Sequence, residues 1–220
     1  TNPAASATPT TTPTATRTSV ATLPAGPVTM VMLGDSLTEG QGDDSAEGGG
    51  YPRRLLTQVQ SLRSASTATN LGKSGWTSGD LINGANEEPA QLGPAVTQMH
   101  GATGAKVAFV WIGSNDLWYL YEYGAPTPAD EAQDLQNYTA NLDTILSQLD
   151  ATGATLFIAL LDDQSQRLVV ANPPNPNEPA LPGISAAERA LMSQQARAYN
   201  NAIRSKATQY GAVVVDFYNT

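Results

Sequence analysis

Hydrophobic residues gather in short runs that are separated by longer amphipathic stretches. Four runs are nearly continuous and as long as a strand, and a fifth is weaker: Val28–Leu33, Lys106–Ile112, Thr155–Leu161, Ala212–Phe217 and, as the weaker one, Thr67–Leu71. Such runs are typical of parallel strands that are covered on both faces. The sequence therefore predicts a largely buried parallel sheet.

Several of the intervening stretches have apolar residues at helical spacing. One includes Leu55, Val59 and Leu62, and a second runs from Leu135 to Leu149. A third starts at Ser185, where Glu188 three residues later completes a capping box. Because strands and helices alternate, we expect an α/β fold, a three-layer sandwich with about five parallel strands and helices on both faces. Ligands of such folds bind beyond the carboxyl ends of the strands, so functional residues are expected in the loops there.

The first 26 residues have a different composition from the rest of the chain. They contain 19 Thr, Pro or Ala residues, one charged residue, Arg17, and no periodic pattern. Such a segment cannot bury enough apolar surface to offset its ordering entropy. We therefore expect a disordered linker over 1–26 and one domain over 27–220. Tethers of this kind often hold a secreted domain away from a surface, which favours a secreted or cell-surface protein over a merely disordered tail.

Charge and composition exclude several classes of function. The chain of 220 residues carries 11 Lys and Arg against 20 Asp and Glu, a net charge of −9, which argues against nucleic acid as a partner. It has no cysteine and one histidine, His100, so thiolate chemistry and multi-histidine metal sites are excluded. We predict neither a metal nor a cofactor. No apolar run approaches the ~18 residues of a membrane span.

The first candidate for chemistry follows the first predicted strand directly. Gly34, Asp35, Ser36 and Leu37 stand where a strand passes into a helix. A serine there presents its hydroxyl at the top of the sheet, and its own N–H lies where negative charge is stabilised. This placement suits a nucleophile, although a serine that only caps the helix would have the same position.

Two more polar loops follow the next two strands. Asn70 and Gly75 lie in one of them, and Asn115 and Asp116 lie in the other. Both loops reach the same edge of the sheet as Ser36. A glycine N–H and an asparagine amide are the donors that a tetrahedral oxyanion needs. The joint placement favours a catalytic site over three unrelated turns.

Together these three motifs resemble the SGNH or GDSL family of esterases and lipases, whose sheet is flavodoxin-like, over about residues 28–217. The resemblance implies that Ser36 is the nucleophile and that Ser36, Gly75 and Asn115 form the oxyanion hole. Asp35, Asn70 and Asp116 would then support the site. It also implies hydrolysis of a carboxylic ester without a cofactor, the substrate being a short-chain ester, an acetylated carbohydrate or a lysophospholipid.

The family's fourth motif, Asp-x-x-His after the last strand, is missing. Asp216 has no histidine three residues later, and His100 is expected at the opposite edge of the sheet, too far away to serve as a base. Three explanations stay open: the natural chain extends past Thr220, a separate C-terminal segment supplies the Asp and His, or the protein is an inactive carbohydrate- or surface-binding module. A nucleotide site at Gly72–Ser74 is disfavoured because the required upstream glycine is replaced by Thr67.

Three further segments allow more than one interpretation. The aromatic residues of 118–123 could stack on a sugar ring, line an acyl pocket or begin a packed helix. Ala171–Gly183, with five prolines in thirteen residues, could border the active site or be a rigid insertion. The carboxylates Asp43, Asp44 and Glu47 fit a solvated acidic loop better than a calcium site.

Overall fold

The computed structural model describes residues 23–45, 48–122, 124, 126–172, 181 and 184–218. Most of the predicted linker, residues 1–22, lies outside this range, so the linker stays a prediction. Five parallel strands form one sheet in the order β2-β1-β3-β4-β5, which confirms the α/β prediction. The strands have these bounds: β1 Val28–Gly34, β2 Thr67–Asn70, β3 Ala105–Trp111, β4 Thr155–Ala159 and β5 Val213–Val215.

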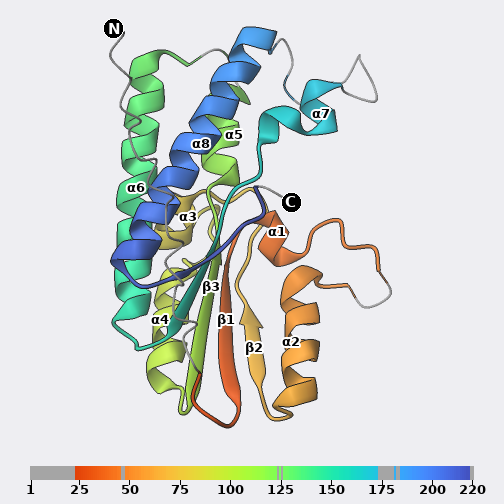
Figure 1. Ribbon diagram of the computed structural model, residues 1–220, viewed down its shortest axis with the longest axis vertical. Coiled ribbons are helices and arrows are strands. Elements are labelled where there is room, and N and C mark those ends of the chain that lie inside the picture. Colours follow the sequence, from red (N-terminus) through yellow and green to blue (C-terminus); the bar gives the residue numbers. More distant parts are fainter. Residues whose placement is uncertain are drawn as a thin grey trace, which may run out of the picture.

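Helices occupy most of the connections between the strands, and Figure 1 shows their arrangement. They have these bounds: α1 Ser36–Glu39, α2 Gly50–Leu62, α3 Ser78–Asn83, α4 Leu92–Gly101, α5 Ser114–Glu122, α6 Pro128–Asp150, the 3₁₀ turn η1 Gln164–Gln166, α7 Leu168–Ala171 and α8 Ala186–Gln209. The capping box predicted at Ser185 is present at the start of α8. None of the described helices is long and apolar enough to cross a membrane.

The strand order places a topological switch point between β1 and β3. The chain leaves β1 toward β2 on one side and later enters β3 on the other side. Gly34, the last residue of β1, lies opposite Trp111, the last residue of β3. The loops that follow these two strands therefore start side by side, which is where open α/β sheets bind ligands.

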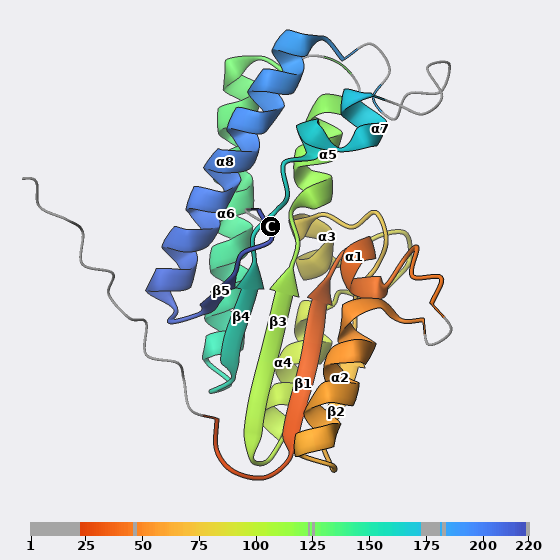
Figure 2. The ribbon, with the colours of Figure 1, turned by 45° about the vertical axis from the view of Figure 1, so that its right-hand side comes forward.

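The two faces of the sheet are covered unequally. One face carries a large core to which α3, α4, α6 and α8 contribute buried side chains. The smaller core on the other face draws its helical members from α2 alone. Figures 1 and 2 show α2 on one side of the sheet and the long helices α6 and α8 on the other.

The large core contains two stacked tyrosines that connect α6, α8 and the sheet. The rings of Tyr138 and Tyr199 lie 4.2 Å apart, and both side chains are fully buried. The Tyr138 hydroxyl donates to the carbonyl of Ile112, 2.9 Å away, just beyond β3. This hydrogen bond fixes the position of α6 along the loop that leads from β3 into α5.

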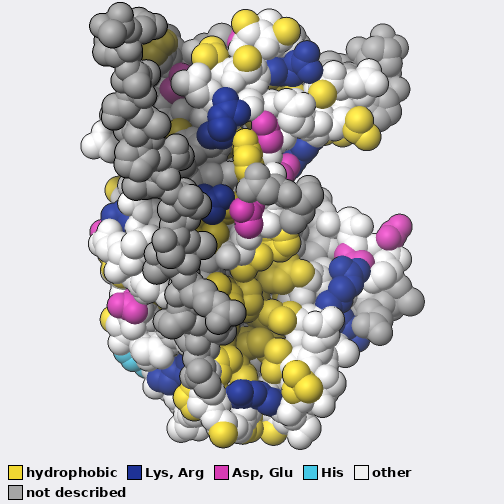
Figure 3. Space-filling model, viewed as in Figure 1, with side chains coloured by type: hydrophobic (Ala, Val, Ile, Leu, Met, Phe, Trp, Pro, Cys, Tyr) yellow, Lys and Arg dark blue, Asp and Glu magenta, His cyan; other side chains and the backbone are white. Residues whose placement is uncertain are grey.

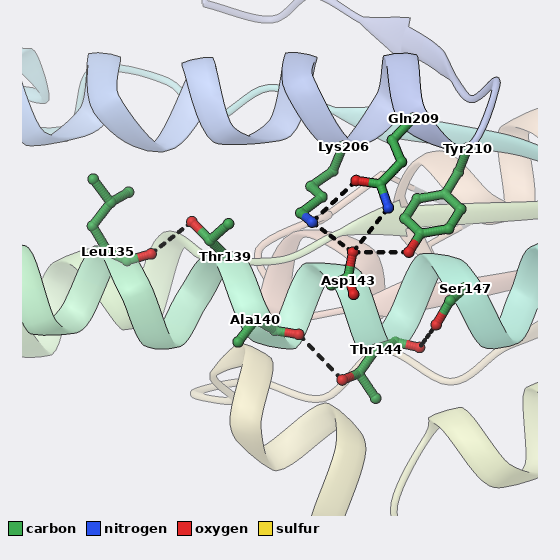
Figure 4. Close-up of polar contacts among 9 residues, drawn as sticks. All are labelled: Leu135, Thr139, Ala140, Asp143, Thr144, Ser147, Lys206, Gln209 and Tyr210. Carbon is green, nitrogen blue, oxygen red and sulfur yellow. Dashed lines mark hydrogen bonds and ion pairs between the residues drawn. The ribbon is translucent and has the colours of Figure 1, made fainter.

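A polar cluster joins the same two helices nearer the end of α8 (Figure 4). Asp143 of α6 accepts hydrogen bonds from Lys206, Gln209 and Tyr210, with Lys206 Nζ 2.5 Å and the Tyr210 hydroxyl 2.8 Å away. The bond from Lys206 is the main cause that lowers the pKa of Asp143, followed by the bond from Tyr210. The cluster is partly exposed to solvent, so the ion pair contributes little to stability and mainly orients the two helices.

On the α2 face, an apolar groove of about 260 Å³ runs over the strands. Its lining includes Met30, Val107, Phe109 and Phe157, and the two phenylalanine rings stack 4.6 Å apart. Figure 3 shows hydrophobic side chains gathered over this part of the sheet. The described residues therefore leave this face less covered than the opposite one.

The structure differs from the sequence prediction mainly at the ends of elements. The apolar run Ala212–Phe217 forms ladder pairs only over Val213–Val215, because β5 has a partner strand on one side only. Asp216 lies just after the strand and pairs with Arg204 at 3.2 Å. The bounds of α3 and α5 were not predicted, since helices this short have too few turns to show a clear period of apolar residues.

Candidate active site

Ser36 is the first residue of α1, directly after β1. Asp35 caps this short helix, and its Oδ1 accepts from the Leu37 N–H at 3.0 Å. The N–H of Ser36 lies in the first turn, where helical N–H groups have no acceptor within the helix. A Cβ at Gly34 would lie 2.2 Å from the carbonyl oxygen of Trp111, so the chain can enter this turn only with glycine there.

The loop after β2 is fastened to α1 by Asn70. Its Nδ2 donates to the carbonyl of Thr38 at 2.8 Å, and its Oδ1 accepts from the Gly72 N–H at 3.0 Å. Further along the loop, Gly75 has a φ of +79°, a left-handed conformation that favours glycine. Asn70 thus acts as a support for the loop that carries Gly75.

The loop after β3 contacts the loop around Gly75. Asn115 Nδ2 donates to the carbonyl of Trp76 at 2.8 Å, and the Tyr119 hydroxyl donates to the carbonyl of Gly75 at 3.0 Å. An amide nitrogen carries two hydrogens, so the bond to Trp76 orients Asn115 and leaves the second hydrogen available. Ser36 and Asn115 also line one pocket. Two of the three residues predicted for the oxyanion hole, Ser36 and Asn115, therefore line the same pocket, and Gly75 lies in the adjoining loop, which Asn115 and Tyr119 contact.

Asp116 ties α5 to α3 from behind the site. Its carboxylate accepts from the N–H of Ser78 at 2.8 Å and from the hydroxyl of Ser78 at 2.5 Å. Asn141 of α6 donates to the same hydroxyl at 2.9 Å. Burial raises the pKa of Asp116 to about 6, against the opposing effect of the bonds from Ser78. The supporting position predicted for Asp116 fits these contacts.

Asp35 is fully buried beneath the turn. Desolvation raises its pKa to about 6, while the hydrogen bond from Leu37 and the charge of Arg167 act in the opposite direction. Its second oxygen, Oδ2, has no hydrogen-bond partner among the described residues. An unpaired carboxylate oxygen in the interior is unfavourable, which agrees with the direction of the shift.

A pocket of about 320 Å³ opens beside Ser36. Three of its lining residues were not predicted from the sequence: Glu122 at the end of α5, Gln164 in η1, and Arg167. Arg167 is held by two bonds from its guanidinium to Asp162, at 2.6 and 2.7 Å. The signal that could have found Gln164 and Arg167 is their place in the polar loop after β4, at the edge where ligands bind.

The described residues place no histidine next to Ser36. His100 lies in the last turn of α4, which leads into the start of β3 and thus the opposite edge of the sheet, as predicted. Asp162 pairs with Arg167, and Asp163 caps η1 and accepts from Ser193. Within the described part of the chain, the hydroxyl of Ser36 therefore has no hydrogen-bonded base.

The aromatic residues of 118–123 lie partly in the pocket and partly in the hydrophobic core. Trp118 and Tyr119 line the pocket, whereas Tyr121 belongs to the core and donates to Glu131 at 2.6 Å. The packed helix is confirmed for Tyr121, while the role of Trp118 and Tyr119 in holding a ligand stays a prediction. Tyr123 and most of Ala171–Gly183 lie outside the described residues.

The acidic loop after α1 is held by its own contacts. Asp43 accepts from Arg54 at 2.7 Å and from the Gly50 N–H at 2.9 Å. Glu47 lies outside the described residues. No group of three or more potential metal ligands among histidine, cysteine and carboxylate side chains occurs in the ranges that the structure describes.

Residues 32–220 match the GDSL-like lipase/acylhydrolase family. The chain belongs to this family. The match starts in β1 and includes the loops of Ser36, Gly75 and Asn115, so it covers every element of the site. Among curated proteins, none matches the chain.

Solved structures of hydrolases, two of them esterases, share this fold. LAE5, an α/β hydrolase from the metagenome of Lake Arreo in Spain, has a TM-score of 0.56 at 20% identity, over 89% of this chain and 79% of its own. Axe2, an acetylxylan esterase from Geobacillus stearothermophilus, has a TM-score of 0.54 at 19% identity, over 87% and 76%. AlinE4, an SGNH-hydrolase family esterase, has a TM-score of 0.51 at 21% identity, over 88% and 77%.

Proposed function

We propose that this protein hydrolyses carboxylic esters with Ser36 as the nucleophile. One observation carries the proposal: the serine after β1 and an oriented asparagine amide after β3 line one pocket, and Tyr119 of the same pocket holds the loop with Gly75 in a left-handed turn. Family membership and the esterase neighbours support the same reaction class.

In the proposed reaction, the Ser36 oxygen attacks the ester carbonyl and the carbonyl oxygen becomes an oxyanion. The N–H groups of Ser36 and Gly75 and the free hydrogen of Asn115 Nδ2 stabilise that charge. Each such donor typically contributes roughly 10²–10³ in rate. The C–O bond to the alcohol then breaks, which leaves an acyl-enzyme, and water releases the acid from Ser36.

A base must remove the Ser36 proton during the attack. We propose that a histidine, oriented by an aspartate, reaches the site from a segment that the 220 residues do not include, since their one histidine, His100, lies at the opposite edge of the sheet. The placement of the chain after β5 supports this source, because Phe217 stacks at 4.5 Å on Trp111, the last residue of β3. Residues that follow this segment would lie at the same edge as Ser36.

The candidate substrates are short-chain esters, acetylated carbohydrates and lysophospholipids. The acetylxylan esterase Axe2 is an example of carbohydrate de-esterification on the same fold. A secreted or cell-surface location would suit a polymeric substrate, and the Thr, Pro and Ala-rich segment 1–26 supports it. The alternative is a module that keeps the fold and binds carbohydrate or a surface without hydrolysis. The lack of a base among the described residues favours this alternative, whereas the oriented Asn115 favours the enzyme.

Fluorophosphonate labelling followed by intact-mass measurement tests the proposal. We expect one adduct on Ser36, because an activated serine reacts with this reagent, and loss of both the adduct and ester hydrolysis in Ser36→Ala. The neighbouring Ser45→Ala variant is the control, since Ser45 lies in the exposed acidic loop. Turnover that survives Ser36→Ala would overturn the proposal. Ligand binding without labelling or turnover would support the binding module.

A further inference from the structure

The pocket beside Ser36 has a largely polar lining. Apart from Leu37 and the aromatic residues Trp118 and Tyr119, its lining residues are polar or charged. Pockets that take alkyl chains are lined mainly by hydrophobic side chains, with few polar groups. The lining of this pocket is therefore informative about the part of the substrate next to the reacting carbonyl.

Unpaired polar atoms are concentrated at the same place. In the described part of the chain, five buried side-chain atoms lack a hydrogen-bond partner, and three of them belong to residues of this pocket: Ser114 Oγ, Glu122 Oε2 and Gln164 Oε1. Folded proteins pair nearly all buried polar atoms, and exceptions call for an explanation. A ligand that supplies the missing partners explains three of the five at once.

Gln164 shows which kind of partner is missing. Its side chain is only 1% exposed, and its Nε2 donates to the carbonyl of Ser114 at 2.7 Å. The reverse orientation of the amide would set two acceptors against each other, so Oε1 must be the unpaired atom. Glu122 Oε2 is a carboxylate oxygen and also an acceptor. The unpaired oxygens of Gln164 and Glu122 thus both need a hydrogen-bond donor, while the Ser114 hydroxyl can both donate and accept.

Hydroxyl groups on the substrate meet this need, and an alkyl chain does not. An acyl or alkyl group in the pocket would leave the buried acceptors unpaired, which is unfavourable. Trp118 adds an aromatic surface for the carbon skeleton of a ring. The volume of about 320 Å³ is at the lower end for small-molecule sites and suits one such ring.

We propose that the pocket binds a sugar ring as the alcohol part of the ester. Its hydroxyls donate to Gln164 Oε1 and Glu122 Oε2, and the ring packs on Trp118. The Ser114 hydroxyl forms a further hydrogen bond with the sugar. This inference rests on the proposed hydrolase function and makes Gln164 and Glu122 the residues that determine specificity.

Two acetate esters with six-membered rings test the inference on the full natural chain. One is a monoacetate of methyl glucopyranoside, and the other is cyclohexyl acetate, which has no hydroxyls. We expect kcat/KM to be about 100-fold higher for the sugar ester, because a site built for hydroxyls strongly rejects an analogue without them. Gln164→Met should lower kcat/KM about tenfold or more for the sugar ester and leave that for cyclohexyl acetate nearly unchanged.

Gln166→Met is the matched control, because Gln166 lies in the same 3₁₀ turn but is exposed and does not line the pocket. It should change neither rate. A variant whose structure is merely disturbed would lose activity on both esters, so the ratio of the two rates isolates the contribution to specificity. Equal rates of the wild type on both esters would overturn the inference while the hydrolase proposal stands.

If neither ester is hydrolysed, the hydrolase proposal fails. The sugar subsite is then tested by measuring whether the protein binds a sugar. Saturation-transfer NMR with methyl glucopyranoside provides that measurement. Binding that is present in the wild type, retained in Gln166→Met and lost in Gln164→Met would support a sugar subsite. Absence of binding to the wild type would overturn it.

Discussion

At the scale of single residues, Asp35 has two opposing effects: its side chain caps α1, and its negative charge is buried. Its carboxylate caps α1 through the bond from Leu37, and that cap sets the position of Ser36. The same carboxylate is fully buried, and desolvation raises its pKa to about 6. The ionised form therefore destabilises the fold although the cap stabilises the helix.

Asp35→Asn separates these two effects. The folded protein binds more protons than the unfolded chain between the ordinary aspartate pKa of 3.8 and the raised pKa of about 6, so stability falls as pH rises through that range. Asparagine caps a helix as well as aspartate and has no charge. We expect the variant to be more stable than the wild type by on the order of 2 kcal/mol at pH 7.5 and about equally stable at pH 3.5.

Urea denaturation at the two pH values measures this difference. Asp116, whose pKa burial also raises to about 6, is present in both proteins, so most of its own contribution cancels; its charge also raises the pKa of Asp35, as a smaller cause than desolvation. The same difference in stability at both pH values would show that the effect of the substitution does not come from the charge of Asp35.

At the scale of elements, the turn from β3 into α5 depends on glycine. Gly113 has a φ of +120°, and a Cβ there would lie 2.7 Å from the ring of Tyr138. That ring is held by its stacking on Tyr199 and its bond to Ile112. The turn that presents Asn115 is therefore packed directly against α6.

Gly113→Ala should destabilise the protein by roughly 2–5 kcal/mol, because backbone strain and overpacking act together. Gly93→Ala is the matched control, since Gly93 is in α4 with nothing within 4 Å of the added Cβ. It should stabilise by roughly 0.5–1 kcal/mol. Thermal unfolding of both variants checks the opposite signs. A neutral Gly113→Ala would show that Tyr138 can move aside.

At the scale of the whole molecule, the unequal faces of the sheet determine where stability resides. The large core on the side of α6 and α8 has many more buried side chains than the core under α2. The groove on the α2 face leaves part of its apolar lining in contact with solvent. Equivalent truncations on the two faces should therefore have different effects.

Leu146→Ala and Leu55→Ala compare the two faces with the same chemical change. Leu146 is fully buried in the large core, so its truncation should destabilise by roughly 2–5 kcal/mol. Leu55 of α2 is only partly buried, and we expect about 1 kcal/mol. Chemical denaturation gives both values. Equal losses would indicate that the α2 face is as well covered as the other.

The class of fold and the three motifs could be predicted from the sequence. Continuous apolar runs and helical spacing are local patterns, so they predicted the strands and the long helices α2, α6 and α8. The motifs at Ser36, Gly75 and Asn115 could be placed at one edge because all parallel strands end there. The same rule put His100 at the opposite edge.

The residues that line the pocket, and the burial of the polar groups around it, could not be predicted from the sequence. Gln164 follows β4 and Glu122 ends α5, and nothing in their sequence spacing predicts that both line one pocket with Ser36. Burial sets the raised pKa of Asp35 and Asp116, and burial depends on every element packed around them. These properties arise from contacts between segments far apart in the chain, which a local pattern cannot encode.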